Sequence, residues 1–400
     1  MNATVDLADT EMFVTGDPHA AWAWLRANAP VYRNPTQDFW ALTKHQDLSA
    51  AYLDHVTFSS EQGTVMGGSF RSGTDTATGK MLICSDPPDH RLLRQQVHQG
   101  FANWMIEKIA AVVREYTNAG FDRLIADGGG DLACDLALEL PAAVLAAMFG
   151  LSRTEAYYLL DLTREMIGFA DGEYSGESAQ MTLVAAQVKI FDFLADLTER
   201  RRRNAGDDLP SVLLKSGING RGLDDGQILY NCMNVVVGGN ETTPYTACAG
   251  TLALMQYPDQ ADTFYRDRSV LPTAIEEILR WTSTNAYVGR TVMKDVTIRG
   301  VEIPAGSKIT LWNASANRDE DVFADPQRFD VTRTPNPHLA FGVGIHRCIG
   351  QVVARQEVGI FFEVLCERGL RLKLAGEVER LRSNFMLGTK HMPVAVVSHD

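Results

Sequence analysis

The 400-residue chain has only six cysteines, and they are scattered along the sequence. They are Cys84, Cys134, Cys232, Cys248, Cys348 and Cys366. No two of them form a C-x-x-C pair, and none combines with histidines at zinc-site spacing, so neither a disulfide framework nor a zinc ribbon is expected. Cysteines within apolar helical patterns are usually small core residues. We therefore expect a protein of the reducing cytoplasm.

Positive charge is also scarce, with 37 Lys and Arg against 50 Asp and Glu and a net charge of −13. This balance argues against a protein that binds nucleic acid or anionic membranes. The one basic run, Arg200 to Arg203, follows an amphipathic pattern and precedes Asn204 and Gly206. It is expected to be the cation-rich last turn of a helix, and a docking patch for a partner is the alternative.

Long apolar runs and an apolar leader are missing too. The first ten residues are acidic and lack the apolar segment of a secretory signal. The longest apolar stretch, about residues 136–151, contains Glu139 and Pro141 and is short for a bilayer. We expect it to be a buried helix, and we expect no membrane partner.

The remaining composition is that of a globular protein, with 45% apolar and 22% charged residues and no evident repeat or linker. Apolar residues recur at i, i+3 and i+4 over residues 89–280, which predicts helices. Short strands are expected at 39–43, 292–298, 307–312 and 392–397. The pattern predicts a mainly α (α+β) chain. The Gly/Ser/Thr-rich segment 61–80 is long for a connection, so it is expected to be a functional lid or locally mobile.

The most informative segment is residues 341–350, Phe-Gly-Val-Gly-Ile-His-Arg-Cys-Ile-Gly. Its glycines let the backbone turn tightly and approach a flat partner. Cys348 stands directly before an apolar helical pattern, where unpaired N–H groups and the helix dipole favour a thiolate. Such a thiolate can ligate haem iron. A buried structural cysteine is the alternative, but Phe, Gly, His and Cys at these offsets favour a ligand.

These ten residues resemble the cysteine-ligand loop of the cytochrome P-450 family, the haem-thiolate monooxygenases. The resemblance covers essentially the whole chain and implies one domain over residues 1–400, helix-rich with small antiparallel β-sheets. It implies haem b with Cys348 as the axial ligand of the iron. The haem would be held without covalent attachment, since no C-x-x-C-H motif occurs.

A second motif lies inside the helical pattern of residues 224–257. Gly238 and Gly239 each cost about 1 kcal/mol relative to alanine in a helix interior, so they are expected to leave room for a flat macrocycle. Glu241 and Thr242 present a carboxylate and a hydroxyl side by side, a pair suited to relaying protons. The alternative is a kinked core helix whose polar residues face solvent.

This motif resembles the family's oxygen-activating segment, in which the acid supplies protons and the threonine steadies the reacting oxygen. Carried over, these catalytic roles fall on Glu241 and Thr242. Pro244 departs from the usual pattern. Because proline cannot donate to the carbonyl of Asn240, a local kink able to hold water is expected.

Two further residue groups gain meaning from the resemblance. Glu277 and Arg280 share one helix face and can pair, and with Arg328 they are expected to form the family's structural triad. His90 and Arg94 lie one helical turn apart and suit a carboxylate. The resemblance places such a pair on a haem propionate, supported by Arg290 and His346. The remaining expected cofactor-binding residues are Phe341, Gly342, Gly350, Gly238 and Gly239.

The resemblance also implies a substrate cavity lined by the 61–82 loop, the region 166–190, residues 283–288 and one face of the distal helix. The named candidates are Asn234, Val237, Asn285, Val288, Phe385 and Met386. Thr284 and Asn285 stand where relatives often carry a proline and an apolar residue, which hints at a polar group on the substrate. The alternative is that these two residues satisfy local backbone.

The resulting hypothesis is a monooxygenase that hydroxylates or epoxidises a small-to-medium, largely apolar natural-product-type substrate, as in secondary metabolism. The substrate is expected to be either free or bound to a carrier protein. No G-x-G-x-x-G follows a predicted strand, so electrons are expected from a ferredoxin or flavodoxin with its reductase, docking near Arg347 on a monomeric enzyme. Oxidative coupling or cyclisation on the same haem is the alternative, and a non-catalytic haem-thiolate sensor is another.

Overall fold

The computed structural model describes residues 5–66, 76–176 and 178–397. The longer helices are α2 (Pro18–Asn28), α3 (His45–Leu53), α4 (Asp89–His98), α5 (Asn103–Ala126), α6 (Glu139–Phe149), α7 (Arg153–Ile167), α8 (Ala179–Arg203), α10 (Asp225–Asn240), α11 (Thr242–Gln256), α12 (Pro258–Arg266), α13 (Leu271–Thr282) and α15 (Gln351–Glu367). Shorter helical segments are α1 (Glu11–Val14), η1 (Leu82–Cys84), η2 (Gln99–Phe101), the π-helical turn η3 (Leu132–Leu136), α9 (Leu209–Lys215), η4 (Arg268–Val270) and α14 (Asn313–Ala316).

The strands are short: β1 (Val31–Arg33), β2 (Trp40–Leu42), β3 (Phe58–Ser59), β4 (Gly129–Asp131), β5 (Gly217–Ile218), β6 (Arg221–Gly222), β7 (Val288–Val292), β8 (Val296–Ile298), β9 (Val301–Ile303), β10 (Lys308–Leu311), β11 (Arg371–Leu374), β12 (Glu379–Arg380), β13 (Thr389–His391) and β14 (Pro393–Val397). The largest sheet has the order β1-β2-β10-β7-β3, and β11-β14-β4 form a second. All pairings are antiparallel except that of β10 with β2.

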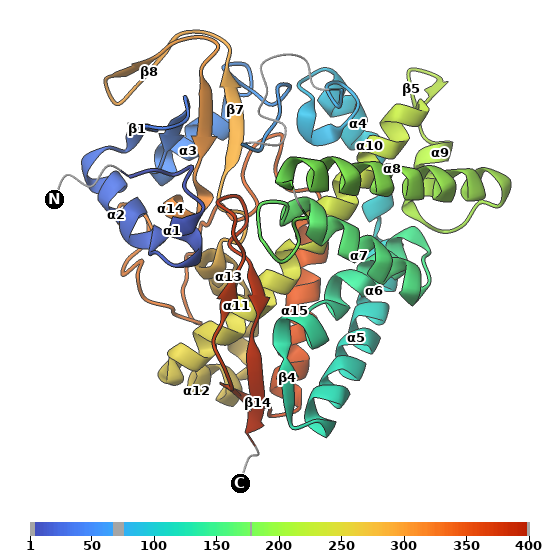
Figure 1. The fold of residues 1–400 in the computed structure, drawn as a ribbon, viewed down its shortest axis with the longest axis vertical. Coiled ribbons are helices and arrows are strands. Elements are labelled where there is room, and N and C mark those ends of the chain that lie inside the picture. The colour runs from blue at the N-terminus through green and yellow to red at the C-terminus, as the bar shows by residue number, and fades with distance from the viewer. Residues whose placement is uncertain (1–4, 67–75, 177, 398–400) are drawn as a thin grey trace.

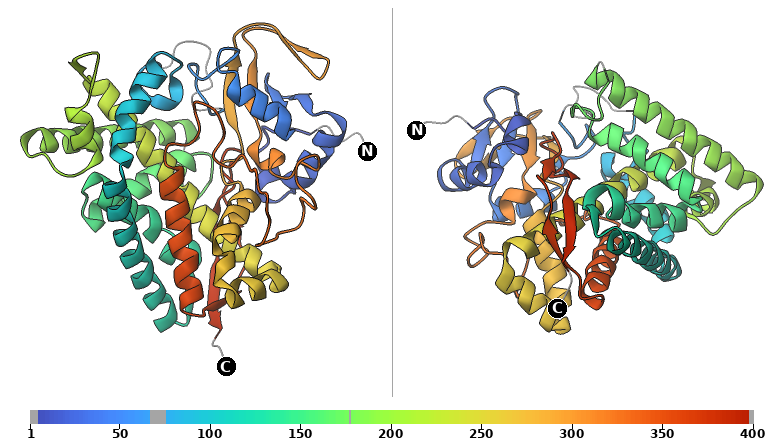
Figure 2. Two further views of the ribbon diagram at one scale, coloured as in Figure 1. Left: turned by 180° about the vertical axis from the view of Figure 1, so that it is seen from behind. Right: turned by 60° about the horizontal axis from the view of Figure 1, so that its bottom comes forward.

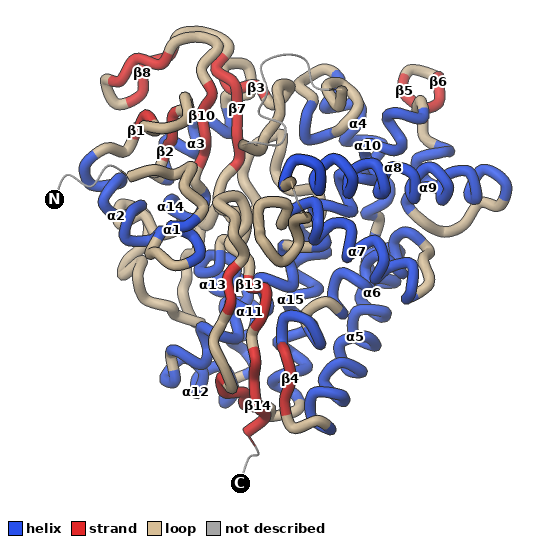
Figure 3. Tube along the Cα trace, viewed as in Figure 1, coloured by secondary structure: helices blue, strands red, loops and turns tan. Residues whose placement is uncertain are grey.

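Helices and sheets occupy different parts of the molecule. The five-stranded sheet lies with α1, α2 and α3 beside a larger helical part that contains α4 to α10 (Figure 1). The view from behind shows α15 running alongside α5, and the two helices pack together (Figure 2). Helices α11 and α13 also pack on α15 (Figure 3). The mainly α fold predicted from the sequence is therefore confirmed.

The apolar stretch near α6 is a core element. One 18-residue window, Leu132–Phe149, is long and apolar enough to cross a membrane by composition, and 83% of it is buried inside the protein. Glu139 within it is fully enclosed and forms ion pairs with Arg123 and Arg153. The window belongs to the main core of this fold, as the interrupted apolar pattern predicted.

The local signals explain where several helices begin and end. Ser152 caps α7 through a reciprocal capping box with Glu155, and Asp224 does the same for α10 with Gln227. Helix α8 ends at Arg203 with four arginines in its last turn, as predicted. Three of these arginines pair with acidic side chains of the same chain: Arg200 with Glu155, Arg201 with Asp208, and Arg202 with Asp225.

Two predicted elements differ in the structure. The strand expected at 292–298 is the end of β7 and a separate hairpin strand β8, because a turn intervenes at residues 293–295. The helix expected over 224–257 is two helices, α10 and α11, interrupted at Glu241. Residues 67–75 of the Gly-rich 61–82 loop lie outside the described residues.

The structural triad needs a correction. Glu277 and Arg280 form the expected ion pair at 2.7 Å, with both side chains fully buried. Its third member is Arg333, whose Nε lies 3.1 Å from Oε2 of Glu277. The prediction of Arg328 is wrong, because the Arg328 side chain is 59% exposed and points to Asp259 instead. Only its backbone carbonyl takes part, accepting hydrogen bonds from Arg280 and Arg333.

Arg333→Ala is expected to destabilise the protein by about 3 kcal/mol, because it removes one partner of a buried ion-pair network. Arg328→Ala is the matched control and should change stability by no more than about 0.5 kcal/mol, since its side chain is exposed. Thermal unfolding of both variants measures the difference. Equal destabilisation by the two substitutions would contradict the corrected triad.

Candidate active site

The interruption between α10 and α11 places a hydroxyl and a carboxylate at the same point of the chain. Helix α10 ends at Asn240 and α11 begins at Thr242, with Glu241 between them. The Thr242 hydroxyl donates to the carbonyl of Gly238 at 3.0 Å. Pro244 has no N–H to continue the ladder. The helical ladder is interrupted at Glu241, about one turn before the proline, while the backbone of Glu241 stays in the right-handed helical region.

The two glycines border open space. A Cβ atom added to Gly238 or to Gly239 would meet no heavy atom within 4 Å outside the local helix backbone. Packed protein atoms therefore do not explain why two residues without side chains stand at the end of α10. A flat group lying along the helix would use this room, as the sequence motif predicted.

Glu241 is fully buried, and its carboxylate makes no hydrogen bond of regular geometry in the described part of the chain, although the Tyr245 and Thr163 side chains lie close enough to lower its pKa. Burial raises the pKa of Glu241 to about 7, although the positive charge of Arg164 opposes this shift. The Arg164 Nε and the Tyr174 hydroxyl are also buried without partners among the described residues. A carboxyl group with such a pKa can take up and release a proton near neutral pH.

A second buried acid lies on the other side of α11. Glu357 of α15 accepts a hydrogen bond from the Thr243 hydroxyl at 3.0 Å, and burial raises its pKa to about 8. Thr242 and Thr243 thus have different surroundings, because the Thr242 hydroxyl bonds the last turn of α10 whereas the Thr243 hydroxyl also ties α11 to α15. The sequence analysis identified Glu241 but missed Arg164 and Glu357. Both lie in helices with no local motif.

The loop before α15 is shaped by its glycines. Gly342 and Gly344 adopt left-handed φ angles of 61° and 81°, and a Cβ on Gly344 would lie 2.7 Å from the carbonyl oxygen of Tyr52. The Cys348 N–H closes the loop by donating to the carbonyl of Phe341 at 2.9 Å. The Phe341 ring packs under the guanidinium of Arg355, with 4.5 Å from Cζ to the ring centroid. Cys348 is consequently held two residues before the N-cap of α15, Gly350.

The electrostatics at Cys348 differ from the expectation of a favoured thiolate. The residue is accessible, yet desolvation by the surrounding protein raises the pKa of its thiol. The Gly350 N–H and the charges of Arg94, Arg355 and Arg347 favour the thiolate but do not outweigh this effect. The helix N-terminus is therefore insufficient by itself. A metal ion that binds sulfur would supply the missing stabilisation of the thiolate.

The four residues expected near a carboxylate do come together. The His90 and His346 rings lie 4.2 Å apart, and the Nε2 of His346 is 3.2 Å from the Ser60 hydroxyl. Burial lowers the pKa of His90 to about 3, and the nearby charges of His346 and Arg94 lower it further. Burial also lowers the pKa of His346, on which the charges of Arg290 and Arg94 act in the same direction. The buried Nε2 of His90 has no partner among the described residues.

The predicted pocket residues have mixed environments. Asn234, Val237, Val288 and Phe385 are half-buried, whereas Met386 is buried with Tyr245 and Leu381 in a small apolar cluster.

Thr284 and Asn285 favour the local alternative over a polar substrate contact. The Thr284 hydroxyl lies 2.9 Å from that of Thr246, and the Asn285 carboxamide oxygen accepts from Asn313 at 3.4 Å. Both polar groups are thus already hydrogen-bonded within the protein.

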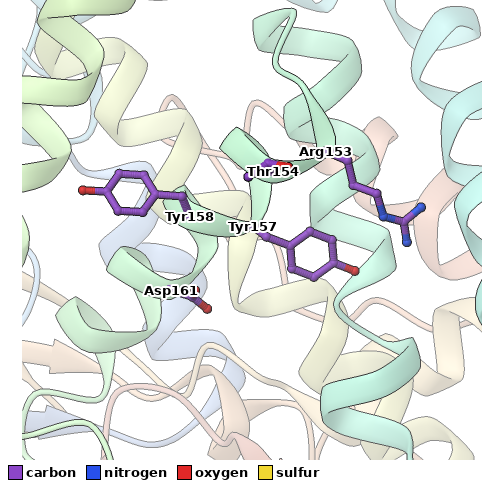
Figure 4. Close-up of a pocket in the computed structure, with 5 residues that line it drawn as sticks. All are labelled: Arg153, Thr154, Tyr157, Tyr158 and Asp161. Atoms are coloured by element: carbon purple, nitrogen blue, oxygen red, sulfur yellow. The ribbon is translucent and has the colours of Figure 1, made fainter.

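A surface hollow of 480 Å³ lies elsewhere, against α7. Figure 4 shows that Arg153 and Tyr157 extend to one side of this helix and Tyr158 to the other. None of its lining residues belongs to the groups described above. The hollow is a separate feature of the surface.

These features were compared with known proteins. The family model for Cytochrome P450 matches residues 32–368. The chain belongs to the cytochrome P450 family. It is therefore an oxidoreductase of the monooxygenase type, and its cofactor is haem b, bound non-covalently through a cysteine thiolate.

Several relatives of this P450 have named activities. It is 35% identical to the steroid C26-monooxygenase of Mycobacterium tuberculosis over 98% of this chain and 96% of that protein. It is 34% identical to the methyl-branched lipid omega-hydroxylase of the same organism, covering 98% and 94%. It is 33% identical to the linalool 8-monooxygenase of Pseudomonas putida, covering 98% of both.

Solved structures share the whole P450 fold. A Mycobacterium marinum cytochrome P450 in complex with pseudoionone has a TM-score of 0.89 at 28% identity, covering 98% of both chains. The P450 OxyD, involved in the biosynthesis of vancomycin-type antibiotics, has a TM-score of 0.87 at 31% identity, covering 99% of this chain and all of the other.

The described residues fit a haem. The pair Gly238 and Gly239 leaves space along α10, and the unpartnered His90 Nε2 beside His346 suits an anionic carboxylate. The accessible Cys348 sulfur follows a loop whose glycines permit a close approach. A flat macrocycle with carboxylate arms and a central iron would use all three features.

The raised pKa of Glu241 predicts a spectroscopic signature. The infrared difference between the wild type and Glu241→Gln should show a protonated carboxyl band that disappears with a midpoint near pH 7. Between about pH 4.5 and 7 the folded protein holds this proton and the unfolded chain does not, so Glu241 lowers stability as the pH rises through this window. A band already absent at pH 5 would contradict the assignment.

Proposed function

We propose that this P450 hydroxylates a C–H bond of a largely apolar, lipid- or terpenoid-like substrate, using O₂ and electrons from a separate redox protein. The observations that carry the proposal are the open space and the buried acid at residues 238–242, and the accessible thiol of Cys348 after its glycine-shaped loop. When bound, the haem supplies the reductive activation of O₂. The protein supplies the ligand, the anchors for the cofactor and the protons.

Cys348 is the proposed iron ligand, and His90, Arg94, Arg290 and His346 are the proposed partners of the haem propionates. The support is the shared location of these side chains. Arg94 donates to the backbone carbonyl of Arg347, the residue before the cysteine, at 2.7 Å. The buried Arg290 lies in the electrostatic field of His346. A haem held by both groups would be fixed at its iron by the Cys348 sulfur and at its propionates by these side chains.

Glu241 and Thr242 are the proposed proton relay. Glu241 is buried and titrates near neutral pH, so it can pass a proton inward and be reprotonated. The Thr242 hydroxyl donates to Gly238 and keeps its acceptor lone pairs for an incoming donor. The break between α10 and α11 places these two groups side by side.

The substrate proposal rests on the relatives and on the local hydrogen bonds. The three relatives are named for their activities on a methyl-branched lipid, a steroid and linalool. Because Thr284 and Asn285 bond other side chains of the protein, they supply no argument for a polar substrate. An apolar substrate is therefore favoured, free or carried by an acyl carrier protein.

The external electron supply follows from the proposal that residues 1–400 form one haem domain. The P450 monooxygenase relatives match almost the whole of these 400 residues. A ferredoxin or flavodoxin with its reductase is the proposed donor, and the exposed Arg347 next to Cys348 is a candidate contact. We propose a cytoplasmic, monomeric enzyme.

Cys348→Ala is expected to abolish the red-shifted Soret band of the reduced carbon monoxide complex, because the thiolate ligand is lost. Cys366→Ala, at the other end of α15, is the matched control and should keep the band. Absorption spectra of the two reduced proteins check this. Persistence of the band in Cys348→Ala would overturn the ligand assignment.

Thr242→Ala is expected to divert electrons from product to peroxide, lowering product formed per reductant consumed at least about 10-fold. Thr251→Ala is the control, since Thr251 makes the same bond to a carbonyl four residues back but lies farther along α11. Measuring product, peroxide and reductant together gives the coupling. Equal coupling in both variants would remove Thr242 from the relay.

Apolar candidates should shift the resting haem spectrum from low to high spin, because a bound substrate displaces the water on the iron. A panel of methyl-branched fatty acids, steroids and monoterpenes, with an amino acid series as the polar control, tests the substrate class. Saturable shifts only with the polar series would contradict the proposal.

A further inference from the structure

A cluster of potential metal ligands lies where the C-terminal strands meet β4, on residues to which the family resemblance assigns no role. Asp131 ends β4, Cys134 lies in the η3 turn three residues later, and His391 ends β13. The sequence spacing gives no hint of this group, because His391 follows Cys134 by more than 250 residues. The sheet β11-β14-β4 brings the segments together (Figure 1).

The three donor atoms are close enough to share one ion. The Oδ2 of Asp131, the Sγ of Cys134 and the Nδ1 of His391 all lie within 4.8 Å of one another. The Sγ–Nδ1 distance is 3.6 Å and the Oδ2–Nδ1 distance is 2.6 Å. Tetrahedral zinc bonds of about 2.0–2.3 Å require donor separations of about 3.3–3.8 Å. The Sγ–Nδ1 separation lies within this range, and the Asp131–His391 contact has to lengthen by about 1 Å.

The surrounding residues orient these ligands. Oδ1 of Asp131 accepts hydrogen bonds from the N–H groups of Ala133 and Met392, both at 3.0 Å, which leaves Oδ2 directed at the histidine. The carboxylate of Glu173 lies 3.1 Å from Nε2 of His391. A carboxylate on the second nitrogen is the usual support of a zinc-bound histidine, and it leaves Nδ1 for the metal.

The chemistry of the donors selects the ion. A thiolate and an imidazole favour zinc and other borderline or soft ions over calcium and magnesium, which prefer oxygen ligands. Three protein ligands leave a fourth position for water. The side chains of His391 and Asp131 are 32% and 22% exposed, so an ion can reach these ligands from solvent.

A neighbouring group of possible ligands fits less well. Glu173, Glu379 and His391 also place three donor atoms together. However, the ammonium group of Lys390 lies 3.0 Å from Glu173 and 3.9 Å from Glu379. This ammonium group, which also pairs with Asp171, lies among the carboxylates and would repel a divalent cation.

We propose that Asp131, Cys134 and His391 bind one zinc ion, with Glu173 as a positioning residue for the histidine. Binding releases the thiol proton of Cys134 and the proton shared by Asp131 and His391, and no atom changes its oxidation state. The ion would tie the C-terminal strand β13 to the segment that leads into the buried helix α6. This inference is independent of the proposed oxidation reaction.

Zinc binding is measured on the haem-loaded, tag-free enzyme with reduced cysteines, by competition with a chromogenic chelator. We expect one zinc ion per chain and a higher melting temperature with zinc than with a chelator. Cys134→Ser and His391→Asn should each weaken binding at least about 100-fold, and Glu173→Gln about 10-fold. Cys366→Ser, another half-buried cysteine, and His98→Asn, on α4, are the controls and should bind zinc normally.

The carbon monoxide spectrum of each variant verifies that it is folded and loaded with haem. If Cys134→Ser does not fold, His391→Asn and Glu173→Gln decide, because both side chains are partly exposed. The absence of saturable binding in the wild type would overturn the proposal. Unchanged affinity in the ligand variants would do the same, since the zinc would then be bound elsewhere.

Discussion

Two adjacent glutamates of α13 hold the segment that presents Cys348. Glu277 is fully buried and accepts hydrogen bonds from Nε and Nη2 of Arg280, from Nε of Arg333 and from the backbone N–H of Asp330. Arg280 in turn donates to the carbonyls of Asn317 and Pro326, within the irregular chain before the cysteine loop. A buried charge is stable only when such partners surround it. This irregular segment therefore has a defined path despite having no regular secondary structure.

The neighbouring Glu276 extends the same support to α15. Its carboxylate accepts two hydrogen bonds from Arg355, and its Oε2 lies 3.0 Å from Nε2 of His338. Burial opposes the charge of Glu276, but these partners lower its pKa to about 2, so it is ionised throughout the physiological range. Arg355 also packs on Phe341 at the start of the cysteine loop. Helix α13 thus fixes both ends of the loop, on which the position of Cys348 depends.

The segment around Glu241 differs from the well-paired glutamates of α13. At Glu241 the helical ladder is interrupted, and a buried carboxyl group makes no hydrogen bond of regular geometry among the described residues. Such a group costs stability, and this cost is consistent with a functional rather than a structural role. The glutamates of α13 are therefore paired with positively charged partners. Glu241, in contrast, can exchange its proton near neutral pH.

Much of the chemistry was predictable from local sequence. Residues 341–350 and 238–242 have specific meaning because the chemistry requires glycines, a thiol and an acid at short, fixed separations. Arg333 was not predictable in this way. It lies five residues beyond Arg328, and only the path of the irregular segment decides which arginine reaches Glu277. Arg164 and Glu357 were missed because each acts on α10 or α11 from another helix.

The sequence by itself determined the family, the helical character and the identity of the thiol, acid and alcohol, because these depend on residue type and on spacing within one turn or loop. The tertiary structure decided the rest. It made Glu241 titrate near neutrality, opposed the thiolate at Cys348, bonded Thr284 to Thr246 and gathered Asp131, Cys134 and His391. Each of these depends on desolvation or on contacts between distant segments, and neither is encoded in any short stretch of chain.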